Sequence, residues 1–219
     1  MTRRLAFINP NSTEAMTASC AASLQAGIGD EFDVRAVTNH DGPPAIQGEE
    51  DGKAAVPGLL DAMTVNDDCD GFILGCFDDT GLAEARAMTD KPVIGIGQAS
   101  FHLAALRGGR FQVLTTLEVS VPVIRANVAN QGFAGVCTAI LASGVPVLEL
   151  EHNPEQSAAI ISDHIAAIER TTVEHSAGTP TIILGCAGMT NIHGRLQSQH
   201  HAILIDPIIA AARLMPALV

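Results

Sequence analysis

The sequence predicts an α/β protein with two pseudo-symmetric lobes, each a four-stranded parallel sheet flanked by helices, and a site at the lobe interface. One observation is a repeated sequence motif: Gly71-Phe72-Ile73-Leu74-Gly75-Cys76 recurs in similar form as Thr181-Ile182-Ile183-Leu184-Gly185-Cys186. A short apolar run bounded by turn-forming residues is typical of a buried strand of a parallel sheet. The other observation is the offset between matching runs in the two halves, about 110 residues throughout, a period too long for a solenoid.

The first half is expected to hold strands at residues 5–8, 32–37, 71–76 and 93–96. Helices are expected from about residue 14 to a glycine at 27 or 29, and at 54–65 and 82–88. Asn11 and Glu14 have the spacing of a capping box, although Ser12 or Thr13 could cap the same helix. Residues 40–52 predict a long loop of the kind that is often functional or mobile.

The second half is expected to repeat this order, with strands at residues 111–114, 145–150, 182–186 and 202–206. A helix at 100–106 would bridge the lobes, and a last helix at 208–218 would return to the first one. The predicted lobes therefore comprise residues 1–97 and 98–206, with residues 207–219 packing back on the first lobe.

Composition and charge exclude several classes of partner. The 219 residues are 47% hydrophobic and include no Trp or Tyr, so an aliphatic core is expected. A net charge of -12 repels phosphate backbones and anionic lipids, which argues against nucleic-acid and membrane partners. The first apolar run has only four residues, which is too short for a signal peptide or a membrane span. A cytoplasmic location is therefore expected, where the five cysteines would stay reduced.

No cofactor is expected from the sequence. Only two lysines occur, Lys53 and Lys91, and neither lies in a stretch typical of a site, which argues against a Schiff base. The cysteines form no Cys-x-x-Cys pair, and nothing in the sequence demands a metal.

Cys76 and Cys186 are the candidate catalytic residues. A lone cysteine is often simply a small buried residue, and Cys20, Cys69 and Cys137 are interpreted that way. Cys76 and Cys186 differ because both follow the repeated strand, at the end where open α/β sheets bind their ligands. A helix N-terminus after each cysteine is expected to lower the thiol pKa from about 8.5, so that one thiolate removes a proton and the other thiol returns one.

Polar groups near these strand ends are candidates for substrate binding. Backbone N–H groups after each cysteine are expected to be free to bind a carbonyl or enolate oxygen, unless the segments are plain strand-to-helix turns. Side chains after the first strand of each lobe could bind a small polar substrate, or could only cap helices. The residues concerned are Phe77, Asp78, Ala187 and Gly188 for the backbone, and Asn11, Ser12, Thr115 and Thr116 for the side chains.

Two histidines are close in sequence to the expected pocket. His102 and His193 are each interpreted as surface or capping residues. His193 follows Cys186 by seven residues, so a Cys–His nucleophilic pair is kept as an alternative.

Several motifs together resemble the hydantoin/allantoin racemases of the aspartate/glutamate racemase superfamily. They are residues 8–13 with Met16-Thr17, the loop at 42–48, Cys76-Phe77, residues 184–189 and residues 205–207. The resemblance implies a cofactor-independent enzyme with one catalytic cysteine per lobe, Cys76 and Cys186, and a homo-oligomer. It also implies that Ile46 lines the pocket with the polar residues named above. The chain departs from the family's usual Cys-Phe-Gly-Asp-Pro-Gly at Asp78 and Thr80, and reads Gly97-Gln98-Ala99-Ser100 where the family tends to have Ala-Glu-Ala-Ala.

The hypothesis is therefore racemisation of a 5-substituted hydantoin or allantoin by two cysteines, at the carbon next to a carbonyl. One alternative within the superfamily acts on a small carboxylic acid, as an amino-acid racemase, maleate isomerase or arylmalonate decarboxylase. Another alternative is a two-lobed protein that binds a small molecule without catalysis.

Overall fold

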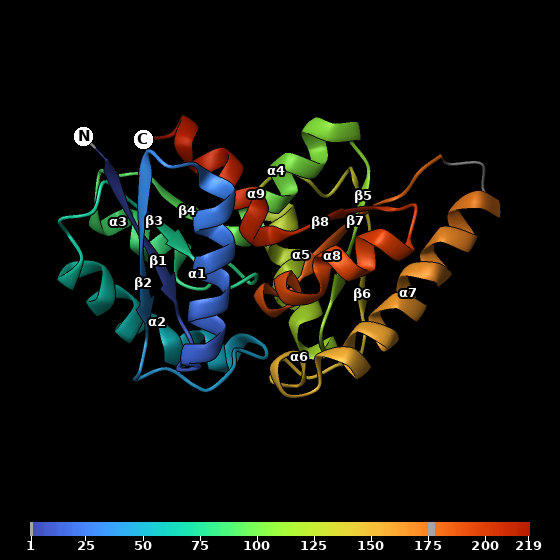
Figure 1. Ribbon diagram of the computed structural model, residues 1–219, viewed down its shortest axis with the longest axis horizontal. Coiled ribbons are helices and arrows are strands. Elements are labelled where there is room, and N and C mark those ends of the chain that lie inside the picture. The colour runs from blue at the N-terminus through green and yellow to red at the C-terminus, as the bar shows by residue number, and fades with distance from the viewer. Residues whose placement is uncertain (1, 175–177) are drawn as a thin grey trace.

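Two four-stranded parallel sheets form the centre of the computed structural model, which describes residues 2–174 and 178–219 (Figure 1). The first sheet has the strand order β2-β1-β3-β4 and the second has the equivalent order β6-β5-β7-β8. The predicted fold class is thus confirmed. The strands are β1 (Arg3–Asn9), β2 (Phe32–Thr38), β3 (Gly71–Leu74), β4 (Val93–Gly95), β5 (Phe111–Thr115), β6 (Cys137–Ala142), β7 (Thr181–Gly185) and β8 (Ile203–Ile205).

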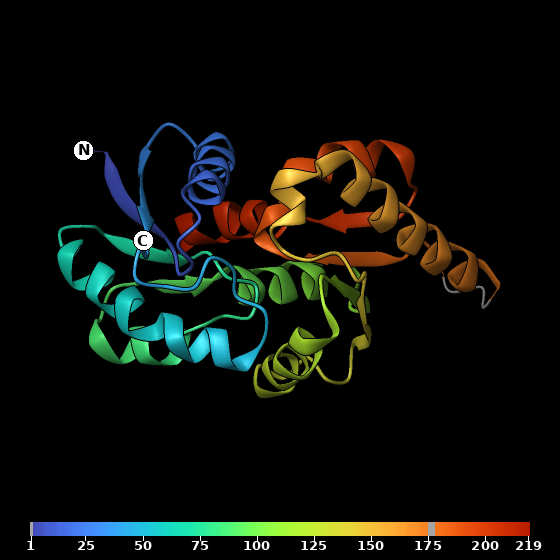
Figure 2. The ribbon, with the colours of Figure 1, turned by 90° about the horizontal axis from the view of Figure 1, so that it is seen from below.

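Helices cover both faces of the first sheet, because alternate residues of its buried strands point to opposite sides. Leu5 and Phe7 of β1 pack in the cluster that includes α1, whereas Ala6 and Ile8 pack in the cluster that includes α2. Figure 2 shows α1 and α2 on opposite sides of this sheet. The helices of this lobe are α1 (Glu14–Ile28), α2 (Glu49–Val65) and α3 (Leu82–Met88).

The second lobe has more helical connections. The α-helices that follow β4 are α4 (Ile96–Gly108), α5 (Val121–Asn130), α6 (Glu149–His152), α7 (Pro154–Glu174), α8 (Thr190–Gln199) and α9 (Pro207–Leu214). Three single 3₁₀ turns complete the chain: η1 (Glu118–Ser120), η2 (Ala187–Met189) and η3 (Met215–Ala217). Among the described residues, no helix is both long enough and apolar enough to cross a bilayer.

A shared apolar core joins the two lobes. One cluster of buried side chains includes β1, α1, α4, α9 and β7, and so spans both sheets. Helix α9 packs against α1 and α4 (Figure 1). Gly27 of α1 faces α9, since a Cβ atom there would lie 3.1 Å from Ala212 Cβ. The division of the chain at residues 97 and 98 stays a prediction, and it falls within the first turn of α4.

The predicted strand at residues 145–150 is wrong. The edge strand that pairs with the outer side of β5 is β6, and residues 145–148 form a loop before α6. The apolar residues Val145, Val147 and Leu150 are buried in the main core cluster, but they reach it from a loop and from α6 instead of from a strand. β6 is an edge strand of small, half-buried residues, so its apolar pattern is weak.

Two helix starts also differ from expectation. Helix α2 begins at Glu49, so the predicted loop at residues 40–52 is shorter and ends at Gly48. The capping box at Asn11 and Glu14 does not form, because Thr13 is the N-cap residue of α1. The Asn11 side chain instead accepts a hydrogen bond from the Thr13 N–H at 3.0 Å, which stabilises the turn before the helix.

Candidate active site

A glycine precedes each candidate cysteine because the neighbouring strand passes close to it. The Gly75 N–H donates to the Ile8 carbonyl of β1 at 2.8 Å, and a Cβ atom at Gly75 would lie 2.5 Å from the Phe7 ring. A Cβ atom at Gly185 would lie 3.0 Å from the Cα atom of Thr115 in β5. The repeated Gly-Cys therefore places each cysteine directly beside the end of the central strand of its sheet.

The structure brings Cys76 and Cys186 to one narrow cavity between the lobes. The empty space among its lining residues is about 370 Å³, including the opening to solvent. All five cysteines are free thiols. Most of the other residues predicted for the site line the same cavity, namely Asn11, Ile46, Phe77, Asp78, Thr115, Thr116 and Ala187.

Two predicted substrate-binding residues do not line the cavity. Ser12 lies in the turn before α1, where its N–H donates to the Pro43 carbonyl at 3.0 Å. Gly188 faces α6, since a Cβ atom there would lie 3.1 Å from Leu150 Cδ1. Ser12 and Gly188 thus support the walls of the cavity from behind.

Sequence reasoning missed two side chains that the second lobe contributes to the cavity. Ser120 ends the turn η1, and Val147 lies in the loop before α6. The Gln47 side chain of the first lobe accepts a hydrogen bond from the Val147 N–H at 3.3 Å, so this loop is held across the lobe interface. Met16 also lines the cavity, although the sequence identified it only as part of a motif.

The two thiols have different hydrogen-bond donors. Cys76 accepts from the Thr80 hydroxyl at 3.4 Å and from the backbone N–H of Asp78. Cys186 accepts from the backbone N–H of Gly188, whereas the Met189 N–H donates to the Cys186 carbonyl at 3.1 Å. The N–H groups of Asp78 and Gly188 thus favour the thiolate of the preceding cysteine, and binding of a substrate oxygen by the backbone after each cysteine stays a prediction.

The predicted lowering of the thiol pKa is also wrong. Burial raises the pKa of Cys76 well above its ordinary value, and it raises the pKa of Cys186 to about 12. Backbone N–H groups lower both pKa values and the Thr80 hydroxyl lowers that of Cys76, but removal of the thiolate from water outweighs them. The nearby Asp78 carboxylate raises the pKa of both thiols further.

Asp78 and Asp79 have separate roles, although they are adjacent. Asp78 lines the cavity, and burial raises its pKa to about 7. Asp79 turns away and accepts hydrogen bonds from the N–H groups of Gly97 and Gln98, in the first turn of α4. It thereby ties the turn after Cys76 to the helix that bridges the lobes.

Polar side chains at the ends of β1 and β5 line the remaining wall. The Asn11 carbonyl oxygen accepts from Asn9 at 2.9 Å, while its amide nitrogen has only the Met16 sulfur as acceptor, at 3.5 Å. The Thr115 hydroxyl donates to the Gly185 carbonyl at 2.9 Å. The Thr116 hydroxyl has no hydrogen-bond partner in the described part of the chain, which leaves it available to a ligand.

Neither histidine belongs to the cavity. His102 lies on the outer side of α4, where its ring packs against Phe133 with centroids 4.9 Å apart. The His193 ring hydrogen-bonds to the Leu204 carbonyl at 3.3 Å and does not line the cavity with Cys186. The alternative of a Cys186–His193 nucleophilic pair is therefore not supported. Across residues 2–174 and 178–219, no group of three or more His, Cys, Asp or Glu side chains is arranged to hold a metal ion.

Known proteins are similar to this chain over nearly its whole length. A hydantoin racemase from Rhizobium meliloti is 36% identical over 214 residues, which cover 97% of this chain and 87% of that protein. The structure of an allantoin racemase from Klebsiella pneumoniae superimposes with a TM-score of 0.90 at 30% identity, covering 99% of this chain and 87% of the other. The structure of an allantoin racemase from Pseudomonas fluorescens superimposes with a TM-score of 0.89 at 25% identity, covering 98% of this chain and 90% of the other.

The match to a family extends over both lobes. The sequence pattern described as Asp/Glu/Hydantoin racemase matches residues 5–215, which include both cysteines and the strands that carry them. The chain therefore belongs to the Asp/Glu/Hydantoin racemase family and is an isomerase of the racemase class.

Proposed function

We propose that the protein racemises 5-substituted hydantoins, with allantoin as one case, by proton transfer between Cys76 and Cys186. The observation that carries this proposal is the single cavity that both thiols line, each at the end of an equivalent strand. The similarity to hydantoin and allantoin racemases supports the choice of substrate class.

The chemistry needs one base and one acid on opposite faces of a planar intermediate. One cysteine, as thiolate, takes the hydrogen from C5 of the ring, and the electron pair of that C–H bond moves onto the C4 carbonyl to give an enolate. The other cysteine, as thiol, donates its proton to C5 from the opposite face. The two cysteines exchange protonation states in each turnover, so the reverse reaction begins from the state that the forward reaction leaves.

Burial of the thiols has a cost and a benefit for this chemistry. It disfavours the thiolate before substrate binds, because the charge is removed from water. The same raised pKa makes the thiolate, once formed, a stronger base towards a weakly acidic C–H bond. Donors that a substrate brings, such as ring N–H groups, compensate part of the cost.

The charge of the cavity favours a neutral ring over a free carboxylic acid. Of the residues that the structure describes, no Lys, Arg or His lines the cavity, Asp78 supplies its one carboxyl group, and this group has no cationic partner. A substrate carboxylate would therefore be desolvated beside an acid, with no opposite charge to stabilise it. This observation argues against the alternatives that act on small carboxylic acids.

The test follows optical rotation and deuterium together. A single enantiomer of a 5-substituted hydantoin, incubated with the protein in D₂O, should lose its optical rotation while deuterium enters C5, faster than in the absence of protein. Prior treatment with a chelator should leave the rate unchanged if the enzyme needs no metal. Racemisation without deuterium incorporation would exclude this mechanism. The cytoplasmic location and the homo-oligomer remain predictions.

A further inference from the structure

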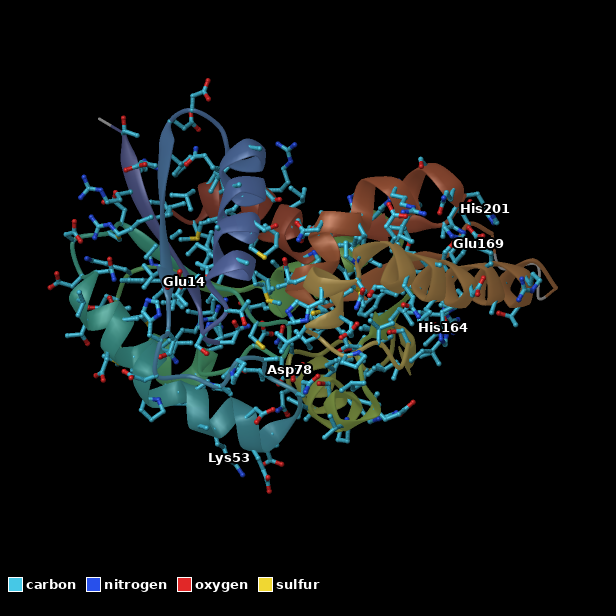
Figure 3. The ribbon with its side chains drawn as sticks, turned by 60° about the horizontal axis from the view of Figure 1, so that its bottom comes forward. Glu14, Lys53, Asp78, His164, Glu169 and His201 are labelled. Carbon is cyan, nitrogen blue, oxygen red and sulfur yellow. The ribbon has the colours of Figure 1, made fainter. Side chains whose placement is uncertain are left out.

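Among the described residues, Asp78 is the one charged side chain that lines the cavity, and the second lobe holds it in place. The Ser120 hydroxyl of η1 lines the cavity with this carboxyl group and lowers its pKa. Its backbone carbonyl accepts from the Asn127 side chain of α5 at 2.6 Å. Asp78 is only 9% exposed, and Figure 3 shows it where the two lobes meet.

The Asp78 side chain lines the same cavity as the sulfurs of Cys76 and Cys186, between which C5 of the substrate is proposed to lie. Its charge raises the pKa of both thiols. The groups that act on Asp78 are the Ser120 hydroxyl and the Asp79 carboxylate, and neither is a cation. The carboxylate is therefore buried without a neutralising partner, a costly state that a donor or cation on a ligand would relieve.

We propose that Asp78 determines which substituent the cavity accepts at C5: one that carries N–H donors or a positive charge is favoured, and one that carries a carboxylate is rejected. This inference rests on the proposed function, since it assumes that C5 of a hydantoin lies between the thiols. The substrate class is then hydantoins with amide, ureido or basic substituents. Allantoin, whose substituent at C5 is a ureido group, falls within this class.

A matched pair of substrates tests the inference. The hydantoins with carbamoylmethyl and carboxymethyl groups at C5 have the same number of heavy atoms and differ mainly in charge. The wild-type protein is expected to racemise the carbamoylmethyl compound with a higher kcat/KM at pH 8. The Asp78→Asn variant keeps the size of the side chain. In this variant the ratio of kcat/KM for the carbamoylmethyl compound to that for the carboxymethyl compound should shrink roughly 10- to 100-fold, as expected when repulsion between two nearby, largely desolvated charges is removed.

Glu118→Gln is the control for loss of an acidic charge. Glu118 lies on the same turn as Ser120, but it is exposed and does not line the cavity. This variant should keep the wild-type preference. Because the preference is a ratio within one variant, a general loss of activity in Asp78→Asn does not affect it.

The outcomes separate the inference from the function on which it rests. A wild-type protein that uses both compounds equally well overturns the role of Asp78, whether or not any variant folds. An unchanged preference in Asp78→Asn overturns it too. Failure of the wild-type protein to racemise any hydantoin would instead overturn the proposed function.

Discussion

The hydroxyl of Thr80 donates a hydrogen bond to the sulfur of Cys76 at 3.4 Å, across one turn of chain. Cys186 has backbone N–H donors but no side-chain hydroxyl as a partner in the described part of the structure. The two thiols therefore have similar places in similar lobes but different chemical surroundings. The Thr80 contact lowers the pKa of Cys76 and so favours its thiolate.

Replacing Thr80 by valine should lower kcat/KM about 3- to 10-fold, which corresponds to the net contribution of one typical hydrogen bond. The rise of activity with pH should also move to higher pH, because the Cys76 thiolate loses a donor. Racemisation of a substrate with one stereocentre has an equilibrium constant of one, so both enantiomers must lose kcat/KM equally. Steady-state rates for each enantiomer between pH 6 and pH 10 measure both effects. Thr80→Ser keeps the hydroxyl and should resemble the wild type; equal losses in both variants would refute the role of the hydrogen bond.

Removing one cysteine should separate proton exchange from inversion. With Cys76→Ala, the remaining thiol can take the C5 hydrogen of one enantiomer and return deuterium to the same face, but cannot complete inversion. Racemisation should fall about 10²- to 10⁴-fold, while exchange persists for that enantiomer alone. Cys186→Ala should show exchange for the opposite enantiomer.

Cys137→Ala is the matched control for these variants, since Cys137 lies on the edge strand β6 and does not line the cavity. Mass spectrometry and optical rotation on the same samples give both rates. Exchange of the same enantiomer by the Cys76 and Cys186 variants would contradict an arrangement with one thiol on each face.

The features that the sequence predicted best are the strands that are buried on both faces. The strands that end at Gly75 and Gly185 are fully buried between layers, so their apolar pattern and their glycines survive as a repeat. Edge strand β6 is only half buried, and its sequence, Cys-Thr-Ala-Ile-Leu-Ala, lacks the repeated motif that identifies β3 and β7. The buried apolar residues at 145–150 instead predicted a strand where the chain packs as a loop.

The candidate site was less predictable than the fold because half of it depends on contacts between lobes. Val147 lines the cavity from a loop that is fixed to the first lobe, since its N–H donates a hydrogen bond to the side chain of Gln47, 100 residues earlier. Ser120 could be identified only once η1 was placed beside Asp78. The predicted lowering of the thiol pKa was wrong for a similar reason. A helix N-terminus can be inferred from a motif, but the burial that outweighs its effect on the pKa arises only when the two lobes pack together.

Gly75→Ala should destabilise the protein by about 1–3 kcal/mol, the usual cost of forcing a methyl group into a packed core. The added Cβ atom would lie 2.5 Å from Cζ of Phe7, whose side chain is fully buried. Phe7→Leu removes the end of that ring, so the double variant should be more stable than the sum of the two single changes predicts. Urea denaturation of the four proteins measures this coupling. Strictly additive effects would contradict the contact, and Gly108→Ala, with open space around its Cα atom, is the control.

Asp79 should make stability depend on pH with a sign that is unusual for a carboxylate in a folded protein. Burial raises its pKa from 3.8 to about 6, although the N–H groups of Gly97 and Gln98 and the Gln131 side chain donate to it. The folded state therefore binds this proton more tightly than the unfolded state does. Its contribution to the free energy of unfolding is fully present below about pH 4 and is lost as the pH rises through 6.

Asp79→Asn removes this titration while preserving the local geometry. Asn, like Asp, tolerates the left-handed backbone at this position, where φ is 50°, and it keeps an acceptor for the first turn of α4. The new amide could also donate to the Gln131 carbonyl oxygen, which has no partner among the described residues, once the Gln131 amide rotates.

The wild-type protein should therefore lose about 1–3 kcal/mol relative to Asp79→Asn between pH 4 and pH 7. Urea denaturation at several pH values measures the difference in slope, which does not depend on any constant offset between the two proteins. Asp90→Asn, which removes an exposed carboxylate, is the control for net charge. Parallel curves for the wild type and Asp79→Asn would show that Asp79 stays ionised in the folded protein, held by its donors despite burial.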